Sequence, residues 1–417
     1  MTEPEHSTRA TLAMFAGLGL FCAAYAYLYG WRLIGAEFID LPSFWVGAKM
    51  AFAQAQPPYG PAFGEAAASL APGYVHPFLY PPATLVLLAP LSALSLTDAG
   101  TAMLAVNLLC APAIGVLLAR LVSREGQVTP AALIVAGVVF VLAAQATRQT
   151  IGHGQVNLAV VLGLLAGLAA VRARLSPVTT GLFLALAILL KLYFGLVLLC
   201  LLLHGQWRAV LTSLAWLGAI SIVSLGVVPA GSWAAWLDFV LLPSRDAAAL
   251  AGQFDLASPR NLALSGVILR WAPEGVAEGL RLAATLTLLL ATCGISLWRR
   301  RAGAEAPSLA EFGAYLCLVV LVAPNSWVHY MVFVLPAAMA VAWAAWRFGS
   351  IWLIVLAAGG ILVLLQNPAR LLGGLVGAAD LLALVCIAAW ALAGWVAIKD
   401  ARTGMTPARA TSGSVET

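Results

Sequence analysis

Long apolar runs separated by short polar stretches dominate the pattern of this chain. A helix needs about 20 apolar residues to cross a membrane. The run 178–204 is too long for one comfortable span and carries Lys191 near its middle, so we divide it into two short helices that meet there. Counting those two, we predict an all-α, polytopic membrane protein with about 12 transmembrane helices. The other candidate spans lie near 11–32, 99–120, 131–147, 155–171, 209–228, 276–298, 309–323, 328–346, 351–366 and 376–397.

The run 83–96 decides the topology. It is only 14 residues long and Pro90 interrupts it, which favours a re-entrant or interfacial segment over a span. If it does not cross, 13 basic residues in short loops and tails fall on one side, as the positive-inside rule expects. They are Arg9, Arg120, Arg124, Arg172, Arg174, Arg208, Arg299, Arg300, Arg301, Arg347, Lys399, Arg402 and Arg409.

The alternative topology is less favourable. If 83–96 crossed and 178–204 crossed only once, Arg120, Arg124, Arg172 and Arg174 would face outward. We therefore predict that both termini are cytoplasmic and that the protein is a multi-pass protein of the cell (inner) membrane.

Two long segments, 33–98 and 229–275, then both face outward as loops. In each, aromatic and apolar residues recur at helical spacing, which is typical of a helix lying in the membrane interface. They are Phe44, Trp45, Ala48 and Phe52 in the first loop, and Trp233, Trp236, Leu237 and Val240 in the second. We predict one transmembrane domain over 1–400, followed by a disordered cytoplasmic tail, 401–417, rich in Thr, Ser and Ala.

Composition supports a membrane protein and excludes a nucleic-acid binder. The chain is 62% hydrophobic and 9% charged, whereas soluble domains carry about 25% charged residues. The net charge of +5 fits cytoplasmic Lys and Arg, and no basic run is long enough to bind nucleic acid. The six cysteines lie in apolar runs without C-x-x-C spacing, so we interpret them as packing residues.

Polar residues with potential chemistry share the predicted outer side. Ionisable groups at membrane depth are expensive and therefore tend to mark function. The set comprises Asp40, His76, Tyr80, Arg148, His153, Gln155, Asn157, Lys191, Arg260, Asn261, Ser326 and His329.

Each candidate also has an ordinary structural explanation. Asp40 precedes Leu-Pro and could cap the interfacial helix, a role compatible with catalysis. The run 152–157 could be a tight turn with Arg148 at the lipid headgroups, although its glycines permit close backbone approach. Lys191 could snorkel towards the membrane surface, and His329 could belong to an interfacial aromatic belt.

Together these residues indicate a negatively charged ligand and a reacting hydroxyl. Arg148 and Lys191 supply positive charge for a phosphate, and Asp40 could accept a proton from a hydroxyl. This combination predicts glycosyl transfer from a lipid-phosphate sugar. The alternatives are a lipid or sugar transporter or flippase, and a non-catalytic scaffold. The sequence shows no repeated halves, and its polar residues lie near one surface rather than at the midplane that transporters use.

The order of several motifs resembles glycosyltransferase family 87, also known as DUF2029, of the GT-C superfamily of polyprenyl-phosphate-sugar-dependent glycosyltransferases. The resemblance covers about residues 38–335. The matching segments are Asp40–Trp45, Pro58-Tyr59, Tyr80-Pro81-Pro82 with Ala89-Pro90-Leu91, Gly154–Asn157, Leu186–Lys191 and Ser326–Tyr330.

The resemblance implies an inverting transferase with Asp40 as general base and His329 as a second catalytic residue near a phosphate. The donor is expected to be polyprenyl-phosphate mannose or the corresponding donor of a related pentose, and the acceptor a glycolipid or glycan. The active site is expected to face the periplasm or exterior. No nucleotide is expected. Neither is a metal, because the region around His153 offers no second carboxylate. We expect the donor phosphate to bind Lys191, Arg148, His153 and Gln155, and the substrates to contact Trp45, Tyr80, Asn157, Ser326 and Arg260.

Overall fold

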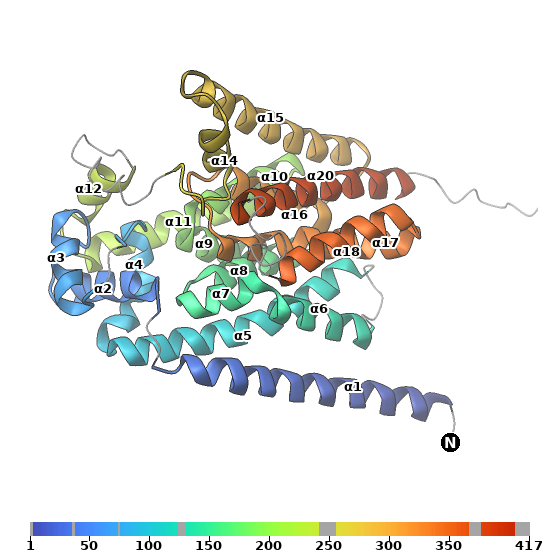
Figure 1. Cartoon of the computed structure of the whole chain (residues 1–417), viewed down its shortest axis with the longest axis horizontal. Helices are drawn as coiled ribbons and strands as arrows, with labels where there is room; N and C mark the ends of the chain where they lie inside the picture. Colours follow the sequence, from blue (N-terminus) through green and yellow to red (C-terminus); the bar gives the residue numbers. More distant parts are fainter. Residues whose placement is uncertain are drawn as a thin grey trace, which may run out of the picture.

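The computed structural model describes residues 3–35, 38–73, 76–123, 130–241, 256–366 and 377–404. Over these residues the backbone is helical almost throughout and contains no strand. Figure 1 shows that most of the long helices run along one common axis and form a bundle. The all-α prediction is therefore confirmed. Helices satisfy their own backbone hydrogen bonds, which is the requirement that a bilayer imposes.

The helices follow the predicted apolar runs. In chain order they are α1 (Glu3–Tyr25), η1 (Ala26–Gly30), η2 (Trp31–Leu33), α2 (Leu41–Phe52), α3 (Pro61–Leu70), α4 (Pro82–Leu88), η3 (Ala89–Ala93), α5 (Leu96–Val122), α6 (Ala131–Ala143), α7 (Gln145–His153), α8 (Asn157–Arg172), α9 (Pro177–Leu190), η4 (Leu192–Leu196), α10 (Val197–Leu203), α11 (Trp207–Val227), α12 (Ser232–Trp236), η5 (Leu237–Leu241), α14 (Leu264–Trp271), α15 (Glu274–Arg301), α16 (Leu309–Val322), η7 (Val328–Val334), α17 (Leu335–Phe348), α18 (Ile351–Leu365) and α20 (Ala378–Gly404).

The number of candidate membrane spans is smaller than the predicted 12. Among the described residues, six helices are long and apolar enough to cross a membrane, and the pair α6–α7, bent by 55°, makes up to seven. Several predicted spans form shorter apolar helices instead, including α8, α9, α16 and α18. The run 178–204 breaks at Lys191, whose extended backbone ends α9. The chain is a multi-pass membrane protein in which many hydrophobic runs form short helices.

The run 83–96 does not form a spanning helix, as predicted. It forms α4 and then the 3-10 helix η3, which begins at Ala89 next to Pro90. Figure 1 shows α4 beside α2 and α3, with α12 near them, at one end of the bundle. We call this the cavity end. Both segments predicted as outer loops contribute helices to it.

At the opposite end of the bundle α1 begins, and α15 and α20 finish (Figure 1). The last turn of α15 carries Arg299, Arg300 and Arg301. Arg172 donates to the Leu121 carbonyl at 2.6 Å, and Arg174 pairs with Glu305 at 2.7 Å. We call this the arginine end. Arg124 and Arg409, which were also predicted on the cytoplasmic side, lie outside the described residues. The predicted tail from 401 is helical as far as Gly404, and its remainder also lies outside them.

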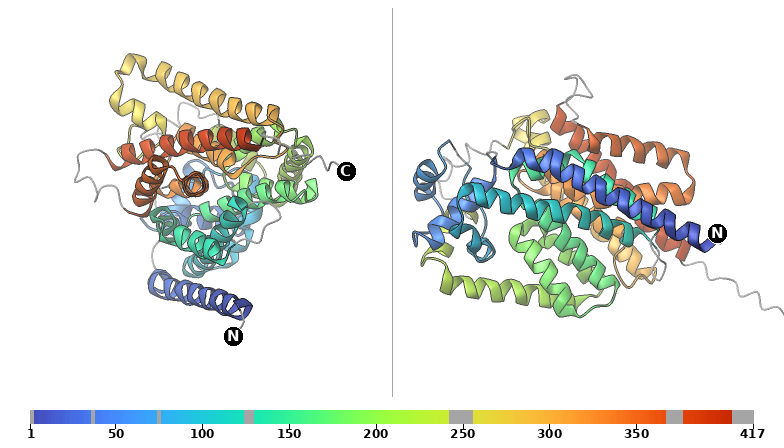
Figure 2. Two further views of the ribbon diagram at one scale, coloured as in Figure 1. Left: turned by 90° about the vertical axis from the view of Figure 1, so that its right-hand side faces the viewer. Right: turned by 90° about the horizontal axis from the view of Figure 1, so that it is seen from below.

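The bundle is most tightly packed around α16 and loosest around α1. Residues Leu309–Leu321 of α16 are all buried. Figure 2 shows α1 beside the bundle rather than inside it, and its apolar side chains, such as Leu12 and Leu20, are exposed. In a soluble protein such exposure would be unfavourable, but lipid is the expected neighbour of these side chains.

A buried polar cluster joins α15 and α16 to the end of α10. Glu311 on α16 is fully buried, and its Oε1 lies 2.7 Å from Nε2 of His204 and 2.5 Å from Oγ of Ser296. Its Oε2 lies 2.7 Å from Nε of Arg299. A buried charge is tolerable only when it is paired and hydrogen-bonded, so this cluster fixes how the three helices meet.

We predict that Glu311→Gln strongly destabilises the protein. It leaves Arg299 buried without its counter-ion, which typically costs about 3–5 kcal/mol. Glu305→Gln is the matched control, because Glu305 and Arg174 form an exposed pair whose loss should cost no more than about 1 kcal/mol. Thermal unfolding midpoints in detergent compare the two. Equal midpoints would show that the Glu311 cluster does not hold the helices together.

Candidate active site

A cavity of about 710 Å³ lies at the cavity end of the bundle. Eight separate stretches of the chain, from the start of α2 to the start of α20, contribute to its wall. The predicted site residues that line it are Asp40, Tyr80, His153, Gln155, Lys191, Arg260 and His329. The fold thus brings together polar residues that lie almost 290 positions apart in the sequence.

Asp40 occupies the N-cap position of α2, but its side chain makes no capping hydrogen bond. Pro42 supplies the preset backbone angle that suits a first helical turn. The carboxylate lines the cavity instead, and its Oδ2 is buried with no hydrogen-bond partner among the described residues. Capping therefore does not explain why an aspartate stands here.

The backbone of Asp40 is held by the end of α7. Its N–H donates to the carbonyl of His153 at 2.9 Å. Directly after His153, Gly154 adopts φ = +67° and ends the helix, a conformation that glycine reaches without strain. A Cβ on Gly154 would lie only 2.8 Å from Cβ of Leu41. The glycine lets the two segments touch, as the sequence predicted for this turn.

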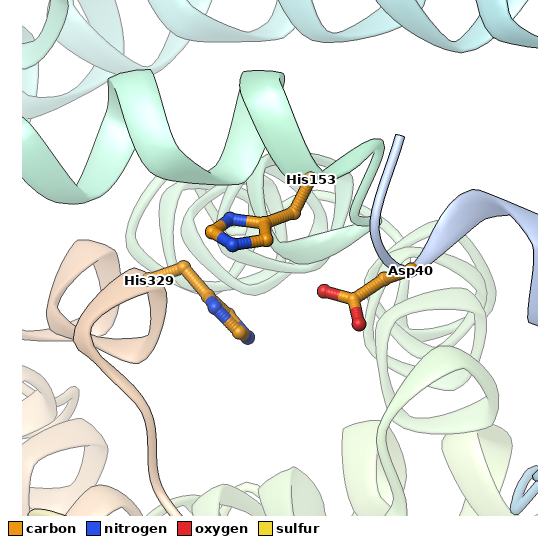
Figure 3. Close-up of side chains that lie close together, drawn as sticks. All are labelled: Asp40, His153 and His329. Atoms are coloured by element: carbon orange, nitrogen blue, oxygen red, sulfur yellow. The ribbon is translucent and has the colours of Figure 1, made fainter. Parts of the chain in front are cut away.

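Two imidazoles face the Asp40 carboxylate (Figure 3). A carboxylate oxygen of Asp40 and one ring nitrogen from each of His153 and His329 lie within 4.8 Å of one another. The ring centroids of the two histidines are 5.2 Å apart. Nδ1 of His153 lies 2.6 Å from the carbonyl of Gln149.

His329 is positioned through its backbone carbonyl. Nδ2 of Asn157 and Oγ1 of Thr150 donate to that carbonyl at 3.2 and 3.3 Å. Asn157 is fully buried behind the cavity wall and does not line it. It therefore orients His329, whereas the sequence alone predicts contact with substrate.

Lys191 brings a buried positive charge to the cavity. It lies in the break between α9 and η4, only 5% exposed, and its Nζ donates to the hydroxyl of Tyr330 at 2.9 Å. Burial lowers the pKa of Lys191 to about 8, and the nearby Tyr193 and Asp40 oppose that decrease.

Arg260 reaches the cavity on a loop that Asn261 fastens to the segment before η7. Nδ2 of Asn261 donates to the Pro324 carbonyl at 3.1 Å, and its Oδ1 accepts from the N–H of Ser326 at 3.0 Å. Arg260 itself is exposed. It is thus a second cation on the cavity wall, more accessible to water than Lys191.

Three further predicted residues do not line the cavity. Arg148 lies on α7 and donates to the carbonyl of Leu365 at 3.1 Å. Nε1 of Trp45 donates to the Leu94 carbonyl at 3.0 Å, which fixes α2 against η3. Ser326 is fully buried and donates to the carbonyl of Val320 at 2.6 Å. These side chains support the fold around the site.

Other contributors escaped the analysis of the sequence. The hydroxyl of Tyr330 accepts a hydrogen bond from Lys191. Its position next to His329, in the segment Ser326–Tyr330 that resembles the family, could have identified Tyr330 as a site residue. Gln149 acts through its backbone carbonyl, which no sequence pattern reveals. Trp236 of α12 lines the cavity and donates to the Leu79 carbonyl at 3.3 Å. It was predicted only as an interfacial aromatic residue.

The cavity therefore combines a carboxylate that can accept a proton, two imidazoles, a buried lysine and an accessible arginine. Aromatic side chains such as Tyr80 and Trp236 add flat apolar surfaces. Such a site suits a ligand with a sugar and a phosphate, because the carboxylate can take a hydroxyl proton while the cations meet the phosphate charge.

Comparison with known proteins reveals similarity over most of the chain. The profile of glycosyltransferase family 87 matches residues 78–324. Two curated relatives are polyprenol-phosphate-mannose-dependent alpha-(1-2)-phosphatidylinositol mannoside mannosyltransferases. The protein from Mycobacterium tuberculosis is 30% identical over 82% of this chain and 79% of its own length. The protein from Mycolicibacterium smegmatis is 28% identical over the same shares. No solved structure matches significantly.

The turn at Gly154 offers a test of how the cavity is assembled. We predict that Gly154→Ala lowers the free energy of unfolding by about 1–3 kcal/mol, because a residue with a Cβ is strained at positive φ and meets Leu41. Gly152→Ala, two residues earlier, should have little effect, since the nearest atom to its added Cβ is 3.6 Å away. Thermal unfolding in detergent measures both. A Gly154→Ala protein as stable as Gly152→Ala would contradict the close contact.

Proposed function

Because this chain belongs to glycosyltransferase family 87 and is a membrane glycosyltransferase, we propose that it transfers mannose from a polyprenol-phosphate donor to a hydroxyl of a glycolipid or glycan acceptor. The names of its two mycobacterial relatives support this donor. The observation that carries the mechanism is the Asp40 carboxylate, which faces the cavity without capping α2.

In the proposed reaction Asp40 is the general base. The acceptor hydroxyl binds to Asp40 and gives it a proton while the oxygen attacks the anomeric carbon of the mannose. The new carbon–oxygen bond forms as the bond from that carbon to the phosphate oxygen breaks. The polyprenyl phosphate leaves with the bonding electrons. In-line attack of this kind inverts the anomeric configuration.

The phosphate of the donor binds among the cations of the cavity. Lys191 is pre-positioned by Tyr330, and a buried charge of this kind stabilises a developing anion more strongly than an exposed one. Arg260 approaches from the accessible side, and His153, Gln155 and His329 complete the phosphate site. Arg148 is left out of this assignment, because its guanidinium donates to the Leu365 carbonyl away from the cavity.

We further propose that the cavity opens on the outer face of the cell membrane. The arginine end lies at the opposite end of the bundle (Figure 1), and short basic loops favour the cytoplasmic side. With this orientation both termini are cytoplasmic. The apolar helices then place the donor's polyprenyl chain in lipid while its phosphate reaches Lys191.

The role of Asp40 as general base can be tested by substitution. Asp40→Asn keeps the shape of the side chain but removes the base, so we expect the transfer rate to fall about 10²–10⁴-fold. The assay follows radiolabelled mannose from polyprenyl-phosphate mannose to a phosphatidylinositol mannoside acceptor in proteoliposomes. Asp98→Asn serves as the control, since Asp98 is an exposed residue in the first turn of α5. Wild-type turnover by folded Asp40→Asn protein would remove Asp40 from the mechanism.

The role of Lys191 in binding the donor phosphate can be tested in the same way. Lys191→Gln should reduce kcat/KM for the donor by about 10–100-fold, because hydrogen bonds to charged groups contribute roughly 1.5–3 kcal/mol. Lys49→Gln removes a charge from α2 outside the cavity lining and should leave donor kinetics unchanged. An equal loss in both variants would indicate that Lys191 acts only through general electrostatics.

A further inference from the structure

Three side chains in the cavity form a cluster that the proposed mechanism only partly uses. Asp40, His153 and His329 point toward a common centre (Figure 3), with ligand atoms within 4.8 Å of one another. We propose that this cluster binds a divalent transition-metal ion of the zinc class. The sequence by itself predicts no metal, because the region around His153 lacks a second carboxylate. Two imidazoles from α7 and η7 take that place.

The cluster contains buried polar atoms without partners. Oδ2 of Asp40 and Nε2 of His329 make no hydrogen bond with the described part of the chain. Leaving such an atom buried and unpaired is unfavourable, because the atom loses its hydrogen bonds to water without replacement. Two such atoms on neighbouring side chains indicate a bound ligand that both can reach, and a cation satisfies a carboxylate oxygen and an imidazole lone pair together.

His153 is prepared as a metal ligand by its other ring nitrogen. Nδ1 lies 2.6 Å from the Gln149 carbonyl, and a carbonyl oxygen can only accept a hydrogen bond. Nδ1 therefore carries the proton in this contact, which leaves the lone pair of the neutral ring on Nε2. A histidine that donates one N–H to a carbonyl and presents the other nitrogen is the usual arrangement in metal sites.

The frame that carries the three ligands is rigid. Asp40 is fastened to the carbonyl of His153 through its backbone. The carbonyl of His329 accepts hydrogen bonds from Thr150 and Asn157. The positions of all three side chains thus depend on the segment from α7 to the start of α8. Metal ligands need this kind of support, because small displacements weaken binding.

The ligand set selects the kind of ion. Magnesium and calcium prefer sites made of oxygen ligands, whereas two imidazoles and one carboxylate suit zinc and similar ions. Three protein ligands leave a coordination position open towards the cavity. On the proposed function, an oxygen of the donor phosphate would bind there, beside Lys191. The second oxygen of Asp40 remains for the acceptor hydroxyl.

Zinc binding by the purified protein tests the proposal without measuring activity. Full-length protein in detergent is stripped with a chelator, incubated with zinc and desalted, and the bound metal is measured by mass spectrometry. We expect about one zinc per chain. His153→Ala and His329→Ala should each weaken zinc affinity at least tenfold. His76→Ala, which removes another histidine of the same cavity, should retain it.

Cobalt absorption of the wild-type protein gives a second measurement that does not rely on folded variants. Cobalt should give visible absorption bands that zinc abolishes by competition. Absence of stoichiometric zinc in the wild type, or equal zinc binding in the His153→Ala, His329→Ala and His76→Ala proteins, would overturn the metal site.

These outcomes are separable from the proposed function. If chelated, metal-free protein transfers mannose at the full rate and binds no zinc, the metal site is refuted while the transferase mechanism stands. If Asp40→Asn protein is fully active, the assignment of Asp40 as base fails regardless of the zinc result.

Discussion

The backbone hydrogen bond from Asp40 to the carbonyl of His153 is the contact on which the active site depends. It joins the segment before α2 to the end of α7, and it exists because Gly154 turns the chain away at positive φ. A residue with a Cβ would press against Leu41. Through this contact, the carboxylate and the two imidazoles share one small region, although they come from distant parts of the chain.

The membrane explains where the remaining polar groups lie. In a bilayer, a charged group must reach an end of a helix or find a buried partner. The arginine end shows the first solution, and Glu311 with His204 and Arg299 shows the second. The cavity adds a third arrangement, in which the buried Lys191 donates a hydrogen bond to the hydroxyl of the neutral Tyr330. That arrangement keeps a cation available for an anionic ligand.

The same low-dielectric surroundings make the cavity suitable for transfer of a sugar from a lipid phosphate. Charges in such surroundings act strongly on one another, so on the proposed function the buried Lys191 would act more strongly on a phosphate than an exposed cation would. The site uses helix ends and breaks rather than helix interiors. Asp40 begins α2, His153 ends α7, and Lys191 follows α9. At these points the backbone turns and side chains can leave the helix surface.

The sequence by itself determined the helical, membrane-spanning character of the chain and its family. It also determined that the run 83–96 is too short to span the membrane and that the helix breaks at Lys191. These features follow from local composition and spacing. The tertiary structure decided which polar side chains reach the cavity. Tyr330 and Trp236 line the cavity, whereas Arg148 and Trp45 donate hydrogen bonds to backbone carbonyls elsewhere. It also brought His153 and His329 together. Hydropathy measures how apolar a segment is but not how its helix is rotated or tilted against its neighbours, and that rotation sets the direction of every side chain.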